Sequence, residues 1–186
     1  PETILSHQFF INNTEEFYRF YRKKILYLDA KPNDAHIKLA ELEAKGKLKA
    51  VITQNIDGLH QLAGSEKVLE LHGSVHRNYC MDCHQFYPVQ MIKDSQGVPK
   101  CSCGGTIKPD VVLYGEGLNS EVMNQSVAAI ASADVLIIGG TSLGVYPAAG
   151  LIDYYRGRNL VLVNKTETPM DSRANLIIKG SIGKVF

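Results

Sequence analysis

The sequence predicts an α/β protein built on a doubly wound parallel sheet, with a small zinc-binding module inserted into it and a helical segment in front. Three observations predict this arrangement. Short apolar runs alternate with stretches of helical pattern, which is typical of a parallel sheet covered on both faces. A polar, turn-rich stretch at residues 75–109 interrupts the alternation. That stretch contains all four cysteines of the chain.

The first expected element is a helix that begins after Asn13. Glu16 would occupy its third helical position, a spacing that resembles a capping box. Phe17, Phe20 and Tyr21 then fall on one face of the helix. We therefore expect this helix to serve packing.

The rest of the chain alternates between helices and strands. A second helix opens at Pro32-Asn33-Asp34 and runs to about Lys45, where Gly46 ends it. Buried strands are expected at residues 50–53, 68–71, 135–138, 160–163 and 176–178, and crossover helices at 121–132 and 147–156. We divide the chain into a sheet domain at 27–74 and 110–186, a zinc module at 75–109 and a helical segment at 1–26.

The four cysteines form two close pairs that predict one structural zinc site. Cys80 and Cys83 are spaced as C-x2-C, and after 17 intervening residues Cys101 and Cys103 follow as C-S-C. Two short loops with two thiolates each supply the tetrahedral shell that Zn²⁺ needs, and a filled shell leaves no open position for catalysis. Two disulfides or four unrelated core cysteines are the alternatives, but a C-x2-C pair makes a poor disulfide. The single spacer of the second pair makes that loop unusually tight.

Composition excludes several classes of function. The 186 residues are 45% hydrophobic and 21% charged with a net charge of +1, as in a soluble globular protein with one core and a small module. We expect no direct contact with nucleic acid, because the sequence shows no basic stripe. The longest apolar runs fall far below the roughly 18 residues of a membrane span. We expect a cytoplasmic protein; its oligomeric state and its protein substrate cannot be read from the sequence.

Polar or small residues follow four of the predicted strands, where a doubly wound sheet binds its ligand. The segment 53–60 places two carboxamides and a carboxylate after one strand, and His72 follows another. The segment 139–144 is rich in glycine and hydroxyl groups, which allow backbone N–H groups to approach a phosphate. Asn164 follows the strand at 160–163 and suits a ribose. Together these strand ends predict a nucleotide site.

Five motifs now occur in the order and spacing of one family. They are Thr53–His60 (TQNIDGLH), Leu71–Ser74 (LHGS), the two cysteine pairs, Lys108–Glu116 (KPDVVLYGE) and Gly140–Leu143 (GTSL). The chain resembles a sirtuin, an NAD-dependent protein-lysine deacylase with a Rossmann-like sheet and one structural zinc ion. Two features depart from the pattern. The glycine-rich G-A-G-x-S segment of sirtuins would precede residue 1, and a protein without it is expected to be inactive because that turn binds the diphosphate. The tight Cys101–Cys103 pair is the other departure.

The resemblance implies a role for each matching residue. In sirtuins the acyl-lysine carbonyl oxygen attacks C1′ of the nicotinamide ribose, nicotinamide leaves, and a histidine then acts as base, which here is His72. The ordinary pKa of imidazole, about 6.5, suits that role near neutral pH. The residues implied to contact NAD are Gln54, Asn55, Ile56, Asp57, His72, Gly140, Thr141, Ser142, Asn164, Lys165, Ser181 and Ile182. The residues implied to flank an extended acyl-lysine peptide are Val112, Leu113, Tyr114, Gly115, Gly144, Val145 and Tyr146. The products would be free lysine, nicotinamide and an O-acyl-ADP-ribose.

Several alternatives stay open at the level of sequence. His72 alone could be a structural histidine. Sirtuins specific for succinyl groups carry a Tyr-x-x-Arg pair, whereas Tyr18 and Arg22 here are four residues apart. ADP-ribosyl transfer to a protein would use the same cofactor, although His72 argues for deacylation. A non-enzymatic NAD-binding or zinc-stapled interaction module is the remaining class.

Overall fold

The computed structural model describes residues 2–186, and its contacts divide the chain into two compact units. The first unit contains the described residues up to Ala30 together with Asn55–Gly58 and His72–Leu118. The second contains Lys31–Gln54, Leu59–Leu71 and Asn119–Phe186. Within residues 2–186, no helix combines the length and the apolar character needed to cross a bilayer.

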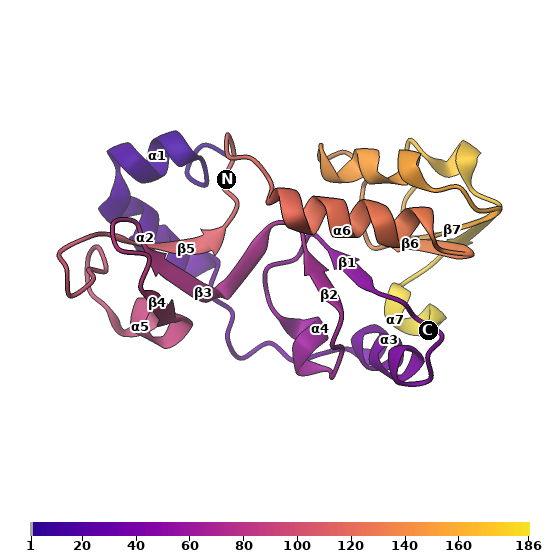
Figure 1. Ribbon diagram of the computed structural model, residues 1–186, viewed down its shortest axis with the longest axis horizontal. Coiled ribbons are helices and arrows are strands. Elements are labelled where there is room, and N and C mark those ends of the chain that lie inside the picture. The colour runs from indigo at the N-terminus through magenta and orange to yellow at the C-terminus, as the bar shows by residue number, and fades with distance from the viewer. Residues whose placement is uncertain (1) are drawn as a thin grey trace. The chain divides into compact units, whose positions relative to one another are not determined.

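The first unit begins with two helices, α1 (His7–Asn12) and α2 (Thr14–Lys24). Phe10, Phe17, Tyr18 and Tyr21 are almost completely buried, and their rings pack against one another with centroids 4.9 to 6.3 Å apart. This aromatic cluster continues through Val75 and Ile107 of the small sheet and through Ile92 of the short helix beside it. The helical segment therefore shares one core with the cysteine-containing module (Figure 1).

A three-stranded antiparallel sheet carries the cysteine module. Its order is β4 (Phe86–Pro88), β3 (Gly73–Cys80), β5 (Ile107–Val111), and the short helix α5 (Val89–Asp94) follows β4. The register between β3 and β5 shifts between Ser74 and Asn78, which marks a bulge. The whole predicted module, residues 75–109, lies within this unit.

The second unit contains a pair of parallel strands, β1 (Val51–Thr53) and β2 (Val68–Glu70), with helices α3 (Asp34–Ala44) and α4 (Leu59–Leu62). Helix α3 is capped as its sequence suggests. The Asn33 side chain accepts a hydrogen bond from the backbone N–H of His36, and His36 Nδ1 reaches back to the N–H of Asn33. This reciprocal arrangement satisfies two N–H groups that would otherwise lack partners at the helix start.

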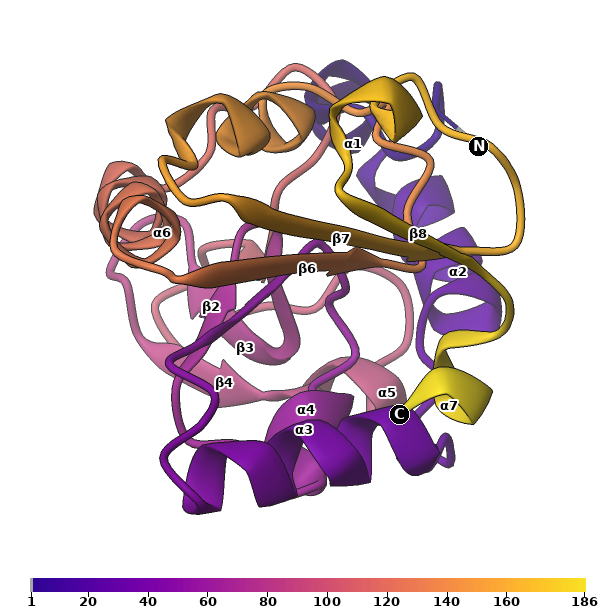
Figure 2. The ribbon, with the colours of Figure 1, turned by 90° about the vertical axis from the view of Figure 1, so that its right-hand side faces the viewer.

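The same unit contains a second parallel sheet of three strands, in the order β6 (Val135–Gly139), β7 (Asn159–Asn164), β8 (Leu176–Lys179). Its helices are α6 (Ser120–Ala131), the 3-10 helices η1 (Ala148–Tyr154) and η2 (Asp171–Arg173), and α7 (Ile182–Val185). Figure 2 shows η1 over one face of this sheet and α7 at the other. The parallel strands expected from the sequence are thus confirmed, in two sheets of the same unit.

Three local expectations change. Asn13 occupies the N-cap position of α2, but its side chain makes no capping hydrogen bond; Thr14 Oγ1 instead donates to the carbonyl oxygen of Phe10 at 2.7 Å. The helix expected at 147–156 is the 3-10 helix η1, which follows a cis Tyr146–Pro147 bond. Helix α1 and the long strand β3 had no expected counterpart. Their residues show neither a complete helical stripe nor a continuous apolar run.

Candidate functional site

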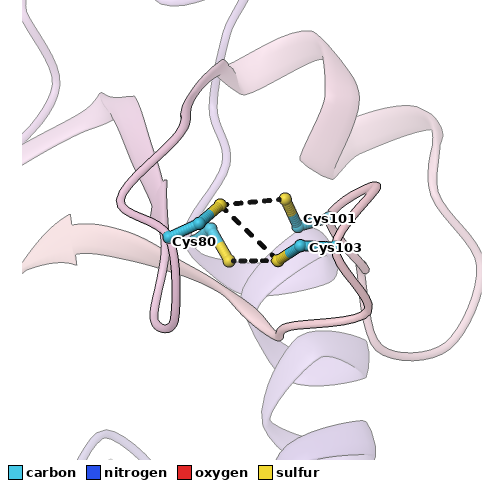
Figure 3. Close-up of side chains that lie close together, drawn as sticks. Cys80, Cys101 and Cys103 are labelled. Carbon is cyan, nitrogen blue, oxygen red and sulfur yellow. Dashed lines mark hydrogen bonds between the residues drawn. The ribbon is translucent and has the colours of Figure 1, made fainter.

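The four cysteines lie at the turn of the β3–β4 hairpin and on the loop before β5. Cys80 is the last residue of β3, and Cys83 is in the turn that follows it. Cys80 and Cys101 are buried, whereas Cys83 and Cys103 are exposed. Figure 3 shows the sulfur atoms of Cys80, Cys101 and Cys103 turned toward one another. The two loops predicted from sequence therefore meet in space.

The sulfur positions fit a tetrahedral zinc ion. All four Sγ atoms lie within 4.8 Å of one another, and the closest pairs, Cys80–Cys103, Cys83–Cys101 and Cys83–Cys103, are 3.5 Å apart. Four sulfurs at a Zn–S distance of about 2.3 Å would be separated by about 3.8 Å. No disulfide joins these cysteines, and among residues 2–186 they are the one cluster of potential ligands of this kind. These cysteines would hold one zinc ion.

Backbone contacts keep the two cysteine loops close. Met81 N, next to Cys80, donates to the carbonyl oxygen of Thr106 at 2.9 Å and so joins the two loops. Within the second loop, Cys101 N donates to the carbonyl oxygen of Gly105 at 2.8 Å. A side chain at Gly105 could not be accommodated, because a Cβ atom there would lie 2.6 Å from both Cys80 Sγ and Asp82 Oδ2. The glycine therefore permits the close approach of the two loops.

The thiols of the cluster differ in pKa. A hydrogen bond from the Tyr87 phenol, with further help from the Cys103 backbone, lowers the pKa of Cys101 to about 6. For Cys103, the Gly105 backbone acts to lower the pKa, but the neighbouring sulfur atoms outweigh it and raise the pKa to about 12. The two pKa values differ because one thiolate disfavours ionisation of the next.

In the second unit, three predicted residues meet at the carboxyl ends of parallel strands. Asn164 closes β7 and donates from Nδ2 to the carbonyl oxygen of Thr141 at 3.0 Å. Gln54, directly after β1, lies with Nε2 3.5 Å from Thr141 Oγ1. Thr141 Oγ1 also accepts from Leu143 N at 3.1 Å, which closes a tight turn after β6. Ser142 is exposed on that turn. The segment expected to contact phosphate and ribose is thus joined to two other strand ends.

The two glycines after β6 have different reasons for being glycine. A Cβ at Gly139 would lie 2.4 Å from Ile182 Cδ1, so Gly139 permits α7 to pack against the strand end. Gly140 has φ +65 and nothing within 4 Å of an added Cβ, so its backbone borders open space. Ser181 caps α7 beside Ile182, and Lys165 is exposed after Asn164. Gly140 is therefore the one of the two whose backbone a ligand could approach.

In the first unit, His72 immediately precedes β3 and is held by its backbone. Its carbonyl oxygen accepts from Val112 N at 3.0 Å. Gly73 follows with φ +75, and a Cβ there would lie 1.9 Å from the carbonyl oxygen of Asp110. The Asp110 backbone therefore occupies the position that a side chain of residue 73 would take. The imidazole of His72 is thus attached to a tightly fixed backbone.

The segment Asn55–Gly58 of the same unit is tied to β3. Val75 N donates to the carbonyl oxygen of Ile56 at 3.0 Å, and His76 Nε2 lies 3.0 Å from that of Asp57. Ile56 packs against the aromatic core of the unit, whereas Asn55 is exposed. These contacts set the backbone of the predicted nicotinamide-contacting residues.

The first predicted peptide-flanking segment uses its own N–H groups internally. Val112 N donates to His72, Leu113 N to Glu116 Oε2 at 2.9 Å, and Tyr114 N to Leu5 at 3.0 Å. In the second unit, Gly144, Val145 and Tyr146 are exposed, with Val145 at 44% and Tyr146 at 68%. Both segments present side chains to solvent, at Tyr114 and at Val145–Tyr146.

Sequence reasoning missed two contacts at these sites. Glu116 and Lys108 belong to a motif that we recognised, but their mutual contact across 3.1 Å was not foreseen. Tyr87, whose phenol contacts Cys101, was not singled out either. Its position between the cysteine pairs was the available signal, but an aromatic residue there is equally consistent with simple packing.

Comparison with known proteins agrees with this geometry. The Sir2 family model matches residues 1–147. The NAD-dependent protein deacetylase of Clostridium perfringens (strain 13 / Type A) is 63% identical over 188 residues, covering 100% of this chain and 77% of that protein. A structure described as Sir2–p53 peptide–NAD+ superposes with a TM-score of 0.93 at 43% identity, covering 99% of this chain and 80% of that one.

A second solved structure gives the same result. It is Sir2 in complex with the inhibitor EX-527, 2′-O-acetyl-ADP-ribose and deacetylated p53 peptide, with a TM-score of 0.93 at 42% identity, covering 100% of this chain and 82% of that one. The family model matches most of the chain, and sequence identity and fold point to the same family. The chain belongs to the Sir2 family.

Proposed function

We propose that this protein is an NAD-dependent protein-lysine deacetylase that releases nicotinamide and O-acetyl-ADP-ribose. The observation that carries the proposal is the 63% identity, along the whole chain, to a relative named NAD-dependent protein deacetylase. Solved relatives of the same fold are described as bound to a p53 peptide and NAD+, to an acetylated peptide, and to 2′-O-acetyl-ADP-ribose with a deacetylated p53 peptide. A protein or peptide carrying acetyl-lysine is therefore the proposed substrate.

We assign the base to His72. NAD, when bound, supplies the ribose that accepts the acetyl group and the nicotinamide that leaves. His72 suits a proton-accepting role because its backbone is fixed between Val112 and Gly73, which limits where the imidazole can point. Gln54, Thr141 and Asn164 present amide and hydroxyl groups at neighbouring strand ends, and such groups both donate to and accept from ribose hydroxyls. The remaining predicted cofactor contacts stay part of this proposal.

The hydrogen bonds of residues 112–115 limit which of their backbone groups could pair with a peptide. A peptide that adds a strand needs backbone N–H groups to donate to it, and those of Val112, Leu113 and Tyr114 already donate within the first unit. The carbonyl oxygens of Leu113 and Tyr114 also accept within this unit, from Glu116 N and His7 N at 2.9 Å. We therefore expect peptide pairing to use the carbonyl group of Val112 and the backbone of Gly115. Gly144–Tyr146 is the proposed second edge.

A preference for succinyl groups finds no support in the two residues that suggested it. Tyr18 is fully buried, and its hydroxyl donates to the carbonyl oxygen of Ile107. Arg22 donates to the carbonyl oxygens of Ile92 and Gly97 and to Ser95 Oγ, at 2.7 to 2.9 Å. The Tyr18 side chain is thus held in the core, and the Arg22 side chain is held by hydrogen bonds to the end of α5 and the loop after it. Neither side chain is therefore available to bind the carboxylate of an acidic acyl group, which favours an uncharged acyl group such as acetyl.

The decisive test is an assay of the natural full-length protein that contains this chain. Matched acetyl-lysine and succinyl-lysine peptides are incubated with and without NAD, and nicotinamide release and acyl loss are measured in the same samples. NAD-dependent release with stoichiometric loss of acetyl is the expected result. Release without acyl loss would indicate ADP-ribosyl transfer instead, and preferential loss of succinyl would contradict the argument from Tyr18 and Arg22. Absence of both signals would reject the proposal.

We also place the protein in the cytoplasm. Its four cysteines form no disulfide although their sulfur atoms lie within 4.8 Å of one another. Thiols so close together persist as metal ligands where the surroundings are reducing. Fractionation of the source cells, probed for this protein, tests the assignment.

A further inference from the structure

The second cysteine pair needs support that its own sequence does not provide. Cys101 and Cys103 are separated by Ser102 alone, so the loop that carries two ligands is very short. Gly104 N donates to the carbonyl oxygen of Cys101 at 2.9 Å, which closes the loop as a turn. A turn of this kind fixes the loop internally but does not orient it toward the other cysteine pair.

Tyr87 adds a side-chain contact to the backbone hydrogen bond between Met81 and Thr106 that already links the two loops. Its hydroxyl donates to Cys101 Sγ at 3.1 Å and accepts a hydrogen bond from Ser102 N at 3.4 Å. One phenol oxygen thus contacts both a ligand sulfur and the backbone of the single spacer residue. Because a hydroxyl can donate and accept at once, neither contact excludes the other.

The phenol is itself held by the other half of the module. Tyr87 is on β4, opposite Asn78 of β3, and its carbonyl oxygen accepts from Asn78 Nδ2 at 3.3 Å. Asn78 is completely buried, and the Tyr87 ring packs against the aromatic core. The strand that leads to the first cysteine pair therefore sets the position of the hydroxyl that contacts the second pair.

We propose that Tyr87 is a positioning residue of the zinc site, which orients the Cys101–Cys103 loop for metal binding and donates a hydrogen bond to the Cys101 sulfur in the loaded site. Outer partners of this type orient ligands and tune the electron donation of the ligand atom to the metal. The inference concerns the metal site and does not depend on the proposed deacetylase activity.

The test compares metal binding by the full chain and its Tyr87→Phe variant. Phenylalanine keeps the ring in the core and removes the hydroxyl alone. In competition with a chromophoric chelator, we expect the variant to bind Zn²⁺ about 10- to 100-fold more weakly. With Co²⁺ in place of Zn²⁺, the thiolate-to-metal charge-transfer band should move to lower energy, because a sulfur without the hydrogen bond donates more readily.

Tyr79→Phe is the matched control. Tyr79 is on β3 of the same sheet, is 37% exposed and packs edge-on against Phe86, with no hydrogen bond of its hydroxyl recorded among the described residues. Removal of this hydroxyl should leave both the affinity and the cobalt spectrum unchanged. An equal effect of the two variants would overturn the inference, because the loss would then come from general weakening of the sheet.

Two further results would also overturn it. One is a Tyr87→Phe variant whose zinc affinity stays within twofold of the parent; the other is a weaker affinity with an unchanged charge-transfer band. If Tyr87→Phe fails to fold, the test uses 3-fluorotyrosine at position 87 instead. Its phenol is more acidic and donates a stronger hydrogen bond, while the side chain keeps nearly the same shape as tyrosine. The cobalt band should then move to higher energy, and a band that does not move would reject the role of Tyr87.

Discussion

Lys108 donates a hydrogen bond to Glu116 across 3.1 Å, at a place where the two side chains expose only 21% and 18% of their area. The Glu116 carboxylate also accepts from Leu113 N at 2.9 Å and lies 2.8 Å from His7 Nδ1. Lys108 donates in addition to the carbonyl oxygen of Val111 at 3.1 Å. The pair thus fixes the backbone around one of the proposed peptide-flanking segments, and links it to the start of α1.

Glu116 should make stability depend on pH in the acid range. Burial acts to raise the pKa of Glu116, but the hydrogen bonds from Leu113, His7 and Lys108 outweigh it, and the pKa lies below its ordinary value of 4.5. A lowered pKa means that the ionised form stabilises the fold above the unfolded value, and that this contribution is lost as pH falls through the folded value. Stability should therefore decrease below about pH 4.5.

Glu116→Gln tests this expectation in urea unfolding at pH 7 and at pH 4. The neutral amide still fits but loses the charge, so we expect the variant to be less stable by about 1–3 kcal/mol at pH 7. The difference between parent and variant should be narrower at pH 4, because below about pH 4.5 the unfolded carboxylate binds a proton more readily than the folded one does. A difference of the same size at both values would contradict the role of the charge.

Gly73 should tolerate no side chain. An alanine there would combine a left-handed φ of +75 with a Cβ placed 1.9 Å from the Asp110 carbonyl oxygen. We expect Gly73→Ala to lower the free energy of unfolding by more than about 3 kcal/mol, since backbone strain and overlap add. Gly97→Ala is the control: it has a similar φ of +62 but nothing within 4 Å, so strain alone should cost about 1 kcal/mol. Equal losses would show that the Asp110 contact relaxes freely.

Features of this fold that depend only on neighbouring residues were predictable from the sequence, whereas contacts between distant segments were not. The strand at 160–163 and the helix after Asn33 were predicted because each carries its signal within a few residues. The cysteine cluster was predicted because ligand spacing alone constrains it. By contrast, the approach of Asp110 to Gly73 and the burial of Tyr18 beneath Ile107 depend on segments far apart in the chain. No pattern around either residue encodes such a contact.

Arg22 should stabilise the first unit far more than its neighbour Arg19 does. Arg22 donates to three oxygen atoms in the last turn of α5 and in the loop that follows it, and lies over the Tyr18 ring, with 5.3 Å from Cζ to the centroid. Charge-assisted bonds to partly buried acceptors are strong, so Arg22→Ala should cost about 3 kcal/mol. Arg19 forms an exposed ion pair with Glu16, so Arg19→Ala should change stability by less than about 0.5 kcal/mol.

Urea unfolding measures both arginine variants, and the acyl preference of Arg22→Ala adds a second result. The Arg22 side chain is used in hydrogen bonds to Ser95 and Gly97. The Arg22→Ala protein that remains folded and active should therefore keep the parent's ratio of acetyl to succinyl turnover. A selective loss of succinyl turnover would instead place Arg22 at the acyl group and reverse the assignment.

His72→Ala should abolish turnover without unfolding the protein. A positioned base contributes roughly 10²- to 10⁴-fold to rate, so kcat for deacetylation should fall by that factor. Zinc content and the urea midpoint should stay near those of the parent, because it is the backbone of His72 that contacts Val112. His84→Asn is the control, since His84 is exposed in a turn with φ 60, a conformation that asparagine adopts readily. Near-normal deacetylation by His72→Ala would remove His72 from the mechanism.

Zinc should be a stoichiometric part of the folded first unit. Cys80 and Cys101 belong to its hydrophobic core beside Val75 and Ile107, so loss of the metal would leave unpaired thiols within that core. A ligand that binds only the folded state stabilises it by about 1.4 kcal/mol for each tenfold rise in its free concentration above Kd. We therefore expect one zinc per chain and an unfolding free energy that rises linearly with the logarithm of buffered free Zn²⁺.

The zinc dependence should disappear when one ligand is removed. Cys83 is exposed, so Cys83→Ser disturbs packing little while it opens the metal shell. In buffered zinc, the variant should unfold at one denaturant concentration whatever the free metal concentration, near that of the chelated parent. If the parent itself shows no dependence on zinc, the four sulfur atoms do not hold a metal that stabilises the fold. The buried pair would then be explained by core packing alone, which is how isolated cysteines usually behave.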